Sequence, residues 1–432
     1  MNSFGYYPES HPQSCQYISW QDQLPHIIQS VDYPYLPIGM RRSYGDSCLN
    51  NDGALLIMTG LNKIMSFDRN RGVLICEAGI TFQEILSIIV PEGFFLPVTP
   101  GTQYITVGGA IANDIHGKNH HKAGSFGNHV RSFGLIRSDQ DEILICSEHE
   151  NHEMFHATIG GLGLTGIIAW AEISLITISS CMIQSRTEQF HGFEEYLAIS
   201  KRQETECDYS VSWFDCFSGD SQRLRGLYTS GNFTESDNEE APDTTIAIPI
   251  HAPEILLNRS TIAVFNELYF RKQLKKVQQS IMHYTPFFYP LDAISDWNKL
   301  YGKRGFLQYQ CVIPFEHARD VISEMLGLMR KKRMGSFLVV LKSFGEIQSK
   351  GILSFPMPGL TLAMDFPMRG METLTVLNQF DDIVSMAGGR VYPAKDARMS
   401  SEYFRKWYPG YELMQSIKDP KIESTFWNRM MR

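Results

Sequence analysis

One segment, Pro97–Gly127, restricts the fold of this chain more than any other part of the sequence. It reads PVTPGTQYITVGGAIANDIHGKNHHKAGSFG and holds six glycines among hydroxyl, amide and charged side chains. So many glycines are unfavourable in a packed helix and wasteful inside a sheet. They suit backbone that approaches a ligand and points its N–H groups at it. A surface loop is the alternative, but the apolar run Val107–Ala112 and the length of the segment argue against it. We expect one wall of a large cofactor site.

Two further segments have the same character. Pro37–Ser47 (PIGMRRSYGDS) combines two glycines with two arginines, and Ile159–Ile168 (IGGLGLTGII) contains four glycines. Backbone N–H groups with arginine charge nearby suit a pyrophosphate. We expect the three segments to surround one ligand.

Length and charge restrict the class of protein. With 432 residues, the chain is expected to form about two or three domains. The net charge of −8 argues against a nucleic-acid partner. It does not argue against an anionic substrate, because a few lysines and arginines are enough to bind a phosphate.

The cysteines and the N-terminus bear on location. The eight cysteines form no Cys-x-x-Cys pair, so we expect neither a zinc site nor a redox motif, but reduced thiols in a cytoplasmic protein. The N-terminus lacks the basic-then-apolar order of a signal peptide. Gly161–Ile178 is interrupted by Glu172 and three glycines, so no membrane span is expected. Peripheral contact with a membrane is left open.

Strand and helix patterns mix without a regular βαβα order, which favours an α+β fold. In the first part we expect strands at Ala54–Met58 and Val73–Ala78, a helix at Phe82–Val90 capped by Thr81, and a hairpin over 132–146. After Ile178 we expect a second α+β domain with an antiparallel sheet. Its expected elements are strands Tyr209–Phe214, Gly305–Ile313, Phe337–Lys342 and Gly359–Phe366, with helices Glu316–Lys332 and Met371–Ala387.

Two segments are predicted from composition. Thr229–Thr245 is polar and acidic, so we expect a mobile loop, either a lid over the site or an insertion. In the tail we expect an aromatic-rich helix at Tyr403–Met414 and another at Phe426–Met431.

Ten segments, met in order along nearly the whole chain, carry a resemblance to a known family. The chain resembles the flavoprotein oxidoreductases of the vanillyl-alcohol-oxidase type, which have a PCMH-type FAD domain. Among them it is similar to the oxidase subunits of decaprenylphosphoryl-ribose 2-epimerases. The segments are GMRRSYGDS, PVTPGTQYITVGGAIANDIHGKNHHKAGSFG, IGGLGLTGII, WFD, FNELYFRK, YPLDAISDWNKLYGKRGFLQYQ, LKSFG, LSFPMPG, MDFP and GGRVYPAKDAR.

The resemblance implies a two-domain architecture. Residues 1–178 would form the PCMH-type FAD-binding domain, and 179–388 a substrate domain on an antiparallel sheet flanked by helices, with the mobile loop near 229–245. Residues 389–432 would return to the FAD domain. The alditol-oxidase relatives carry a covalently linked histidine in the first loop; Ser43 and Tyr44 stand there instead, so we expect non-covalent FAD.

The resemblance also implies site residues. Cofactor contacts are expected at Pro37, Ile38, Gly39, Met40, Arg41, Arg42, Ser43, Tyr44, Gly45, Asp46, Ser47, Gly101, Thr106, Val107, Gly108, Gly109, Asn113, Asp114, Ile115, His116, Ile168 and Tyr392. Substrate contacts are expected at Lys118, Trp213, Gln308, Gln310, Lys342, Phe344 and Ala363, and catalytic groups at Lys395, His116 and Tyr392.

Two positions depart from the mycobacterial members of the family. Ala363 replaces their active-site cysteine, and Phe288 replaces a tyrosine. Both departures concern the substrate pocket rather than the flavin. The alanine predicts that nitroaromatic inhibitors that target the cysteine do not trap this protein covalently.

The residues themselves leave roles open. Lys395 would stabilise anionic reduced flavin, or would accept a proton if burial lowers its pKa from about 10.4; the alternative is a solvated lysine paired with Asp396. His116 would be a base or a flavin-positioning group. A metal site at His116, His120 and His121 is disfavoured, because adjacent residues of extended chain face opposite ways.

Spacing alone leaves the substrate-side residues open as well. Gln308 and Gln310 share one strand face, which would aim both amides at a sugar or else at solvent. Lys118 and Lys342 are candidate phosphate partners, or surface charges.

The leading hypothesis is an FAD enzyme that oxidises the 2-hydroxyl of a polyprenylphosphoryl pentose to a keto sugar by hydride transfer to flavin N5. A separate NAD(P)H-dependent reductase would complete the epimerisation, and a quinone or oxygen would accept the electrons. The alternatives are a flavin oxidase of a free sugar, alditol or aldonolactone, and a non-catalytic flavin-binding scaffold.

Overall fold

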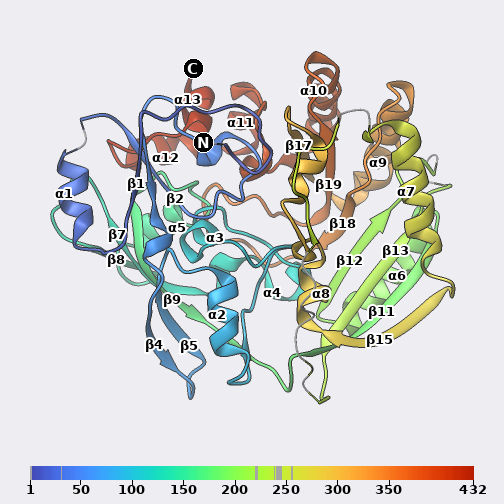
Figure 1. The fold of residues 1–432 in the computed structure, drawn as a ribbon, viewed down its shortest axis with the longest axis horizontal. Coiled ribbons are helices and arrows are strands. Elements are labelled where there is room, and N and C mark those ends of the chain that lie inside the picture. The colour runs from blue at the N-terminus through green and yellow to red at the C-terminus, as the bar shows by residue number, and fades with distance from the viewer. Residues whose placement is uncertain (1, 31, 219–221, 238, 240–245, 254–255) are drawn as a thin grey trace.

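The computed structural model describes residues 2–30, 32–218, 222–237, 239, 246–253 and 256–432. Two large antiparallel sheets, with helices packed around them, make up most of the described chain (Figure 1). This confirms the α+β fold. None of the helices in the described ranges combines the length and the apolar character that crossing a membrane requires.

The first part of the chain builds two sheets, visible on the left of Figure 1. The smaller is parallel, with the order β1-β3-β2 (Ser14–Tyr17, Ala54–Ile57, Tyr35–Ile38). The larger is antiparallel, with the order β4-β5-β9-β7-β8 (Ile64–Asp68, Val73–Glu77, Ile167–Ser174, Val130–Ile136, Leu144–Ser147). Strands β3 and β5 and the β7–β8 hairpin match the sequence prediction.

Helix α2 (Phe82–Ile89) begins as predicted. Thr81 Oγ1 accepts a hydrogen bond from Glu84 N at 3.2 Å, and the Glu84 carboxylate accepts one from Thr81 N at 2.8 Å. The side chains of Phe82, Ile85 and Ile89 are buried, which is the spacing of an amphipathic helix. Local sequence therefore determined this element.

The glycine-rich segment contradicts one expectation, because Val107–Ala112 forms helix α3. Thr106 caps it, with Oγ1 accepting from Gly109 N at 3.2 Å. A Cβ on Gly108 would lie 3.2 Å from the Ala78 carbonyl oxygen, so glycine lets the helix pack closely on its neighbour. Glycine in this helix allows close packing against a neighbouring segment, which helix propensity alone does not predict.

The rest of the chain is organised on an eight-stranded antiparallel sheet, on the right of Figure 1. Its order is β15-β11-β13-β12-β18-β19-β17-β20 (Val277–His283, Met182–His191, Arg225–Phe233, Tyr209–Phe214, Val339–Phe344, Gly359–Pro367, Phe306–Ile313, Arg390–Val391). Two short pairs complete the strands: β6 (Phe94–Phe95) with β10 (Ile176–Thr177), and β14 (Ile246–Ala247) with β16 (Ile294–Ser295).

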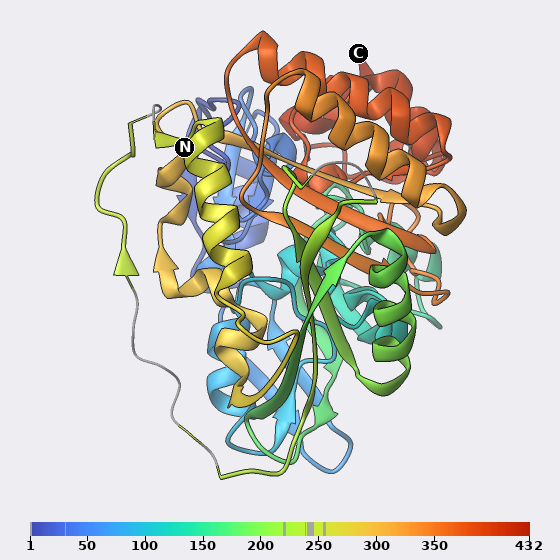
Figure 2. The same cartoon turned by 90° about the vertical axis from the view of Figure 1, so that its right-hand side faces the viewer.

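The two faces of this sheet differ. Tyr309 packs on Phe380 of α10 (Met371–Met386) with ring centroids 5.3 Å apart, whereas Gln308 and Gln310 on either side of it face a large cavity. Figure 2 shows α6 and α7 on opposite sides of the sheet. The helices of this part are α6 (Phe193–Glu206), α7 (Arg259–Arg271), α8 (Tyr284–Phe288), α9 (Phe315–Lys331) and α10 (Met371–Met386). Those of the first part are α1 (Gln23–Ser30), α2, α3, α4 (His120–Ala123) and α5 (His152–Thr158).

The predicted mobile loop is partly wrong. Residues 229–233 belong to β13, which pairs with β11 on one side and β12 on the other. Glycine, serine and threonine dominate this strand, so its composition resembled a loop, whereas its pairing is set by distant residues. Residues 238 and 240–245 lie outside the described residues.

The tail contains three helices, α11 (Ser401–Trp407), α12 (Tyr411–Ile417) and α13 (Thr425–Met431). The single helix predicted over Tyr403–Met414 is therefore wrong, because Pro409 and Gly410 interrupt it. Arg429 of α13 binds the buried Asp46 at 2.9 Å and Asp396 at 3.0 Å, which ties the last helix to the first glycine segment. The division at residues 178 and 388 stays a prediction.

Candidate active site

A cavity of about 1230 Å³ lies where the three glycine segments, the eight-stranded sheet and the tail meet. Ordinary small-molecule pockets measure roughly 300–1,000 Å³. The cavity therefore has room for a dinucleotide together with a second ligand. Both sheets contribute to it, since Ile168 of β9 and Trp213 of β12 lie in its wall.

Most residues predicted to contact the cofactor lie in the cavity wall. From the first segment these are Pro37, Ile38, Gly39, Met40, Arg41, Arg42, Ser43, Tyr44 and Ser47. From the other segments and the tail they are Gly101, Thr106, Gly108, Gly109, Asn113, Ile115, His116, Ile168 and Tyr392. The structure thus brings three distant stretches of sequence to one place; their contacts with a cofactor stay a prediction.

Four predicted cofactor residues do not line the cavity. Val107 is the first residue of α3, and its side chain is buried in the core. Gly45 packs on the tail, where a Cβ would lie 1.6 Å from the Asp396 carbonyl oxygen, and the Asp46 carboxylate binds Arg429. Each of these supports the wall from behind.

Asp114 is the fourth, and it closes the glycine-rich segment on itself. Its carboxylate accepts hydrogen bonds from Ser125 Oγ at 2.8 Å, Gly127 N at 2.8 Å and Ser354 Oγ at 2.5 Å. Burial raises its pKa, and these donors oppose that effect. It is a structural group.

The cavity wall also contains residues that the prediction did not name. They include Thr99, Pro100, Thr102, Tyr104, Ile105, Ala112, Leu162, Gly163 and Gly166 from the two later segments, with Cys48, Met58 and Ala78. Thr99 and Thr102 belong to the polar pattern of the glycine-rich segment and were open to prediction. Met58 and Ala78 follow ordinary strands, so nothing in their local sequence marks them.

Unpartnered polar atoms test whether the cavity suits a flavin dinucleotide. Arg42 Nε, Ser47 Oγ and His116 Nδ1 are buried without a hydrogen-bond partner in the described structure, and all three residues line the cavity. Buried polar atoms are usually paired. Two donor nitrogens and a hydroxyl aimed at a cavity of this size match a ligand rich in phosphate and carbonyl acceptors, as FAD is.

His116 is held in one tautomer beside strand β17 of the eight-stranded sheet. The Gln310 amide nitrogen lies 2.8 Å from His116 Nε2, and because an amide N–H donates, Nε2 accepts and the ring proton is on Nδ1. Burial, and then the charge of Lys342, lowers the pKa of His116 well below its usual value. The imidazole is therefore neutral at pH 7. His120 and His121 do not share its partner: the His121 ring contacts the Cys207 carbonyl, and the ring nitrogens of His120 have no hydrogen-bond partner in the described structure.

Three partly buried lysines in the wall, Lys118, Lys342 and Lys395, have no carboxylate within ion-pair distance in the described part of the chain. Burial lowers the pKa of Lys118 to about 7 and that of Lys342 to about 8, and the positive charge of Lys342 adds to the shift of Lys118. Their ammonium groups donate only to backbone, to the Phe287 and Gly117 carbonyls respectively. Such cations favour an anionic ligand.

Lys395 is the third lysine. Burial lowers its pKa to about 7, although the charge of Asp365 acts in the opposite direction. Its ammonium lies 3.7 Å from the ring centroid of Tyr44, a cation–π contact. The alternative that Lys395 is solvated and paired with Asp396 is wrong, because Asp396 instead contacts Arg429 and Arg398.

Asp365 was not predicted as a site residue, although it belongs to the MDFP segment. Its carboxylate accepts from Gln308 Nε2 at 2.7 Å and from Tyr301 Oη at 3.2 Å. Burial raises its pKa to about 7. Because Gln308 gives its amide N–H to Asp365, its carbonyl oxygen remains for the cavity, which Gln308 lines.

The remaining predicted residues are divided between the wall and its support. Trp213 and Ala363 line the cavity, and Trp213 Nε1 donates to the Phe337 carbonyl at 2.9 Å. Tyr392 donates to the Asn113 carbonyl at 2.7 Å. Phe344 does not line the cavity; its ring packs 4.8 Å from that of His116 and so orients the imidazole.

Comparisons with known proteins identify the domain and the family. Residues 23–147 match the family described as FAD binding domain. The chain is 35% identical over 384 residues to the decaprenylphosphoryl-beta-D-ribose oxidase of Mycolicibacterium smegmatis, covering 86% of this chain and 82% of that protein.

Two further relatives are more distant. An uncharacterized protein in the mprA 5' region of Streptomyces coelicolor is 26% identical, covering 79% of this chain and 96% of that protein. The human Delta(24)-sterol reductase is 28% identical over 152 residues, which are 34% of this chain and 29% of the reductase. The match to the reductase covers about a third of each chain, so it does not show a relationship over the whole chain. From the full-length match and the domain match together, the chain belongs to the decaprenylphosphoryl-β-D-ribose oxidase family and is an FAD-dependent oxidoreductase.

Proposed function

We propose that this enzyme oxidises the 2-hydroxyl of a polyprenylphosphoryl pentose to the keto sugar. The observation that carries the proposal is the group of lysines in the cavity wall that lack acidic partners, beside a wall that opens onto an apolar helix face. A lipid-linked sugar phosphate has an anionic group, hydroxyl groups and an apolar tail. The cavity wall has cationic, polar and apolar side chains that suit these three parts. The name of the 35% identical oxidase agrees with it.

The cofactor would be held by the wall formed from the three glycine segments, with Arg42, Ser47 and His116 supplying polar contacts. Bound FAD supplies a two-electron acceptor for the hydride of the alcohol carbon. No histidine stands in the first segment, so the proposal is non-covalent binding.

Lys395 is the proposed proton acceptor for the substrate hydroxyl. A pKa of about 7 leaves a substantial neutral fraction at physiological pH, as a general base requires. His116 is a poorer base, because Nε2, the ring nitrogen that carries the lone pair, already accepts a hydrogen bond from Gln310. Its Nδ1–H is a donor, which suits positioning of substrate or cofactor. Tyr392 would orient this region through Asn113.

Lys118 and Lys342 are the proposed phosphate ligands. Without an anion each carries an uncompensated buried charge, and a phosphate within reach would restore their usual protonation. Gln308, with its carbonyl oxygen free, would accept from a sugar hydroxyl. Trp213, Phe288 and Ala363 would shape the apolar side of the pocket.

We also propose that the enzyme meets the lipid at a membrane surface. On α7, Val264, Phe265 and Leu268 are 60%, 46% and 66% exposed, and Phe265 also lines the cavity. Leu274 just beyond the helix is 93% exposed, among the basic residues Arg271, Lys272, Lys275 and Lys276. Apolar and basic side chains together suit peripheral binding to anionic lipid.

The reaction needs two partners if it serves epimerisation. Electrons would pass to a quinone or oxygen. A separate NAD(P)H-dependent reductase would return a hydride to the keto sugar, because oxidation alone does not invert the carbon.

Anaerobic reduction of the flavin tests the proposal. The FAD-loaded enzyme is mixed with polyprenylphosphoryl ribose, arabinitol or an aldonolactone, and loss of the flavin absorbance is followed. We expect rapid bleaching with the first substrate only. Bleaching by arabinitol or the lactone alone would replace the proposal with a free-sugar oxidase, and no bleaching by any would favour a scaffold.

A matched pair of variants tests the phosphate ligands. Lys118→Met should raise KM for the phosphorylated substrate at least about tenfold. Lys122→Met is the control, because Lys122 lies outside the cavity and pairs with Asp208 at 3.1 Å. Equal KM values for the two variants would argue against a phosphate at Lys118.

A further inference from the structure

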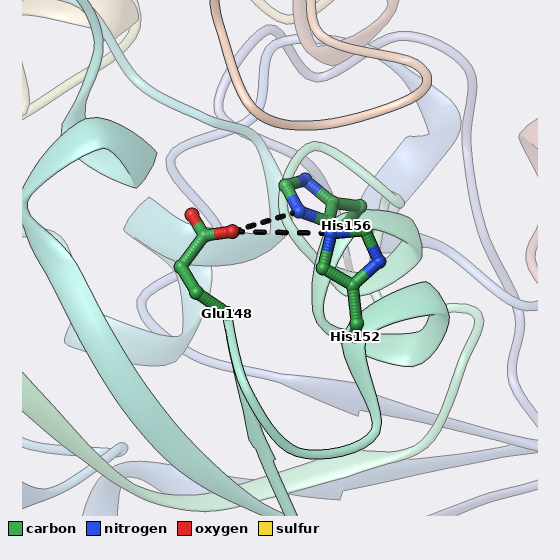
Figure 3. Close-up of side chains that lie close together, drawn as sticks. All are labelled: Glu148, His152 and His156. Carbon is green, nitrogen blue, oxygen red and sulfur yellow. Dashed lines mark hydrogen bonds and ion pairs between the residues drawn. The ribbon is translucent and has the colours of Figure 1, made fainter.

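A cluster of metal-binding side chain types lies outside the cavity. Glu148 follows β8, and His152 and His156 are one turn apart on α5, so that both rings face the Glu148 carboxylate (Figure 3). Residues 152–156 read HEMFH, which has the H-E-x-x-H spacing that places two imidazoles on one helix face. The segment lies outside the motifs on which the predicted site is based.

The spacing of the three side chains suits a small divalent ion. Glu148 Oε2 lies 3.1 Å from His156 Nε2 and 4.0 Å from His152 Nε2, and the ligand atoms lie within 4.8 Å of one another. Bonds of about 2.0–2.1 Å in a tetrahedral zinc site place ligand atoms about 3.3 Å apart. Small side-chain rotations bring this group to that geometry.

The second nitrogen of His156 supplies an independent observation. His156 Nδ1 lies 2.7 Å from the Lys350 carbonyl oxygen, to which it donates, and this bond turns Nε2 towards Glu148. Nε2 therefore faces a carboxylate oxygen 3.1 Å away, and either a ring proton or a metal ion bound by both atoms satisfies this contact. Metal-bound histidines usually have their other ring nitrogen hydrogen-bonded in this way.

Lys350 also holds the carboxylate. Its ammonium lies 2.8 Å from Glu148 Oε1, which leaves Oε2 for the position between the two histidines. The ammonium lowers the affinity for a second cation but fixes which oxygen is free. The His152 side chain is 66% exposed, so an ion has access from solvent.

We propose that Glu148, His152 and His156 bind one Zn²⁺ ion, with water completing the coordination. Two imidazoles and a carboxylate form a donor set that zinc accepts. The bound ion would stabilise the contact between α5 and the segment that contains Lys350. Lys350 lies in the segment whose Ser354 donates to Asp114, so an ion at α5 would help to hold that segment against the glycine-rich wall.

Calorimetric titration of the FAD-loaded, chelator-treated protein with Zn²⁺ tests the proposal. We expect one ion per chain in the wild type. His152→Ala should weaken binding more than about tenfold, since loss of even an outer-shell partner commonly costs 10–100-fold. His149→Ala is the control, because His149 is a neighbouring histidine outside the cluster.

Thermal unfolding gives a second readout. Zn²⁺ should raise the unfolding midpoint of the wild type and of His149→Ala, but not of His152→Ala. No bound zinc in the wild type, or equal binding by the two variants, would overturn the proposal. Because His152 is largely exposed, its substitution should leave folding and substrate-dependent flavin reduction intact.

Discussion

Gln310 and His116 are joined by a hydrogen bond of 2.8 Å that connects strand β17 of the eight-stranded sheet to the glycine-rich segment. The bond crosses between two walls of the cavity, which both residues line. It also fixes the proton on Nδ1, so the state of the imidazole depends on a residue more than 190 positions away.

Gln310→Glu should change the pH dependence of the enzyme. A carboxylate at this distance would raise the pKa of His116 from its depressed value, so that the ring becomes charged at neutral pH. We expect the rate of flavin reduction to fall about 10–100-fold at pH 7 and to recover as the pH rises. Gln310→Met, which adds no charge, should lower the rate without adding this pH dependence. Identical pH profiles for the two variants would contradict the assignment.

Substitution of Lys395 separates its two possible roles. As a base it acts when neutral, so the wild-type rate should rise with pH through about 7. Lys395→Met should lower the rate about 10²–10⁴-fold while FAD remains bound, and should remove that titration. Lys395→Arg keeps a permanent charge. Activity near wild type in the arginine variant would make the charge, rather than proton transfer, the function of this side chain.

Lys342→Met should stabilise the substrate-free protein. The folded-state pKa of Lys342 is about 8 against 10.5, so the unfolded chain binds more protons between these values. Stability of the wild type therefore rises with pH through this window, and below it the full cost of the buried charge remains. We expect a gain of about 1–3 kcal/mol at pH 7 that shrinks towards pH 10.5, measured by chemical unfolding. Lys122→Met should show no such gain; a similar gain there would refute this explanation.

Gly39→Ala should impair FAD binding. A Cβ at this position would lie 2.1 Å from Thr106 Oγ1, the atom that caps α3, so the wall itself must shift. We expect the purified variant to contain less than about a tenth of the FAD that the wild type contains, because the cap of α3 is disturbed and the wall is displaced. Gly327→Ala in α9 has no heavy atom within 4 Å of the new Cβ and should retain the flavin. Equal flavin content in both variants would exclude this steric role.

Elements with local signals were predictable from the sequence. The Thr81–Glu84 capping box located α2, and alternation located β12 and β17. Strands β11, β13 and β15 were missed, because their pairing depends on partners up to about a hundred residues away rather than on composition. Helix α3 was missed because its glycines serve packing on Ala78, which local propensity does not report.

The site was predictable to a similar extent. Family motifs indicated the lysines and glutamines that line the cavity, but motif membership did not separate the wall from its support. Asp46, Asp114 and Phe344 lie in the motifs and act behind the wall. Asp365 lies in a motif as well, and its importance comes from the Gln308 contact made across two strands.

Through its contacts with Asp46 and Asp396, Arg429 of α13 stabilises a loop near the start of the described chain. A ribosome that has completed the three glycine segments has not yet made Arg429, the side chain that neutralises Asp46. Asp46 can therefore gain this partner only after α13 has been made, and deleting residues 425–432 would remove no wall residue yet leave Asp46 without its arginine.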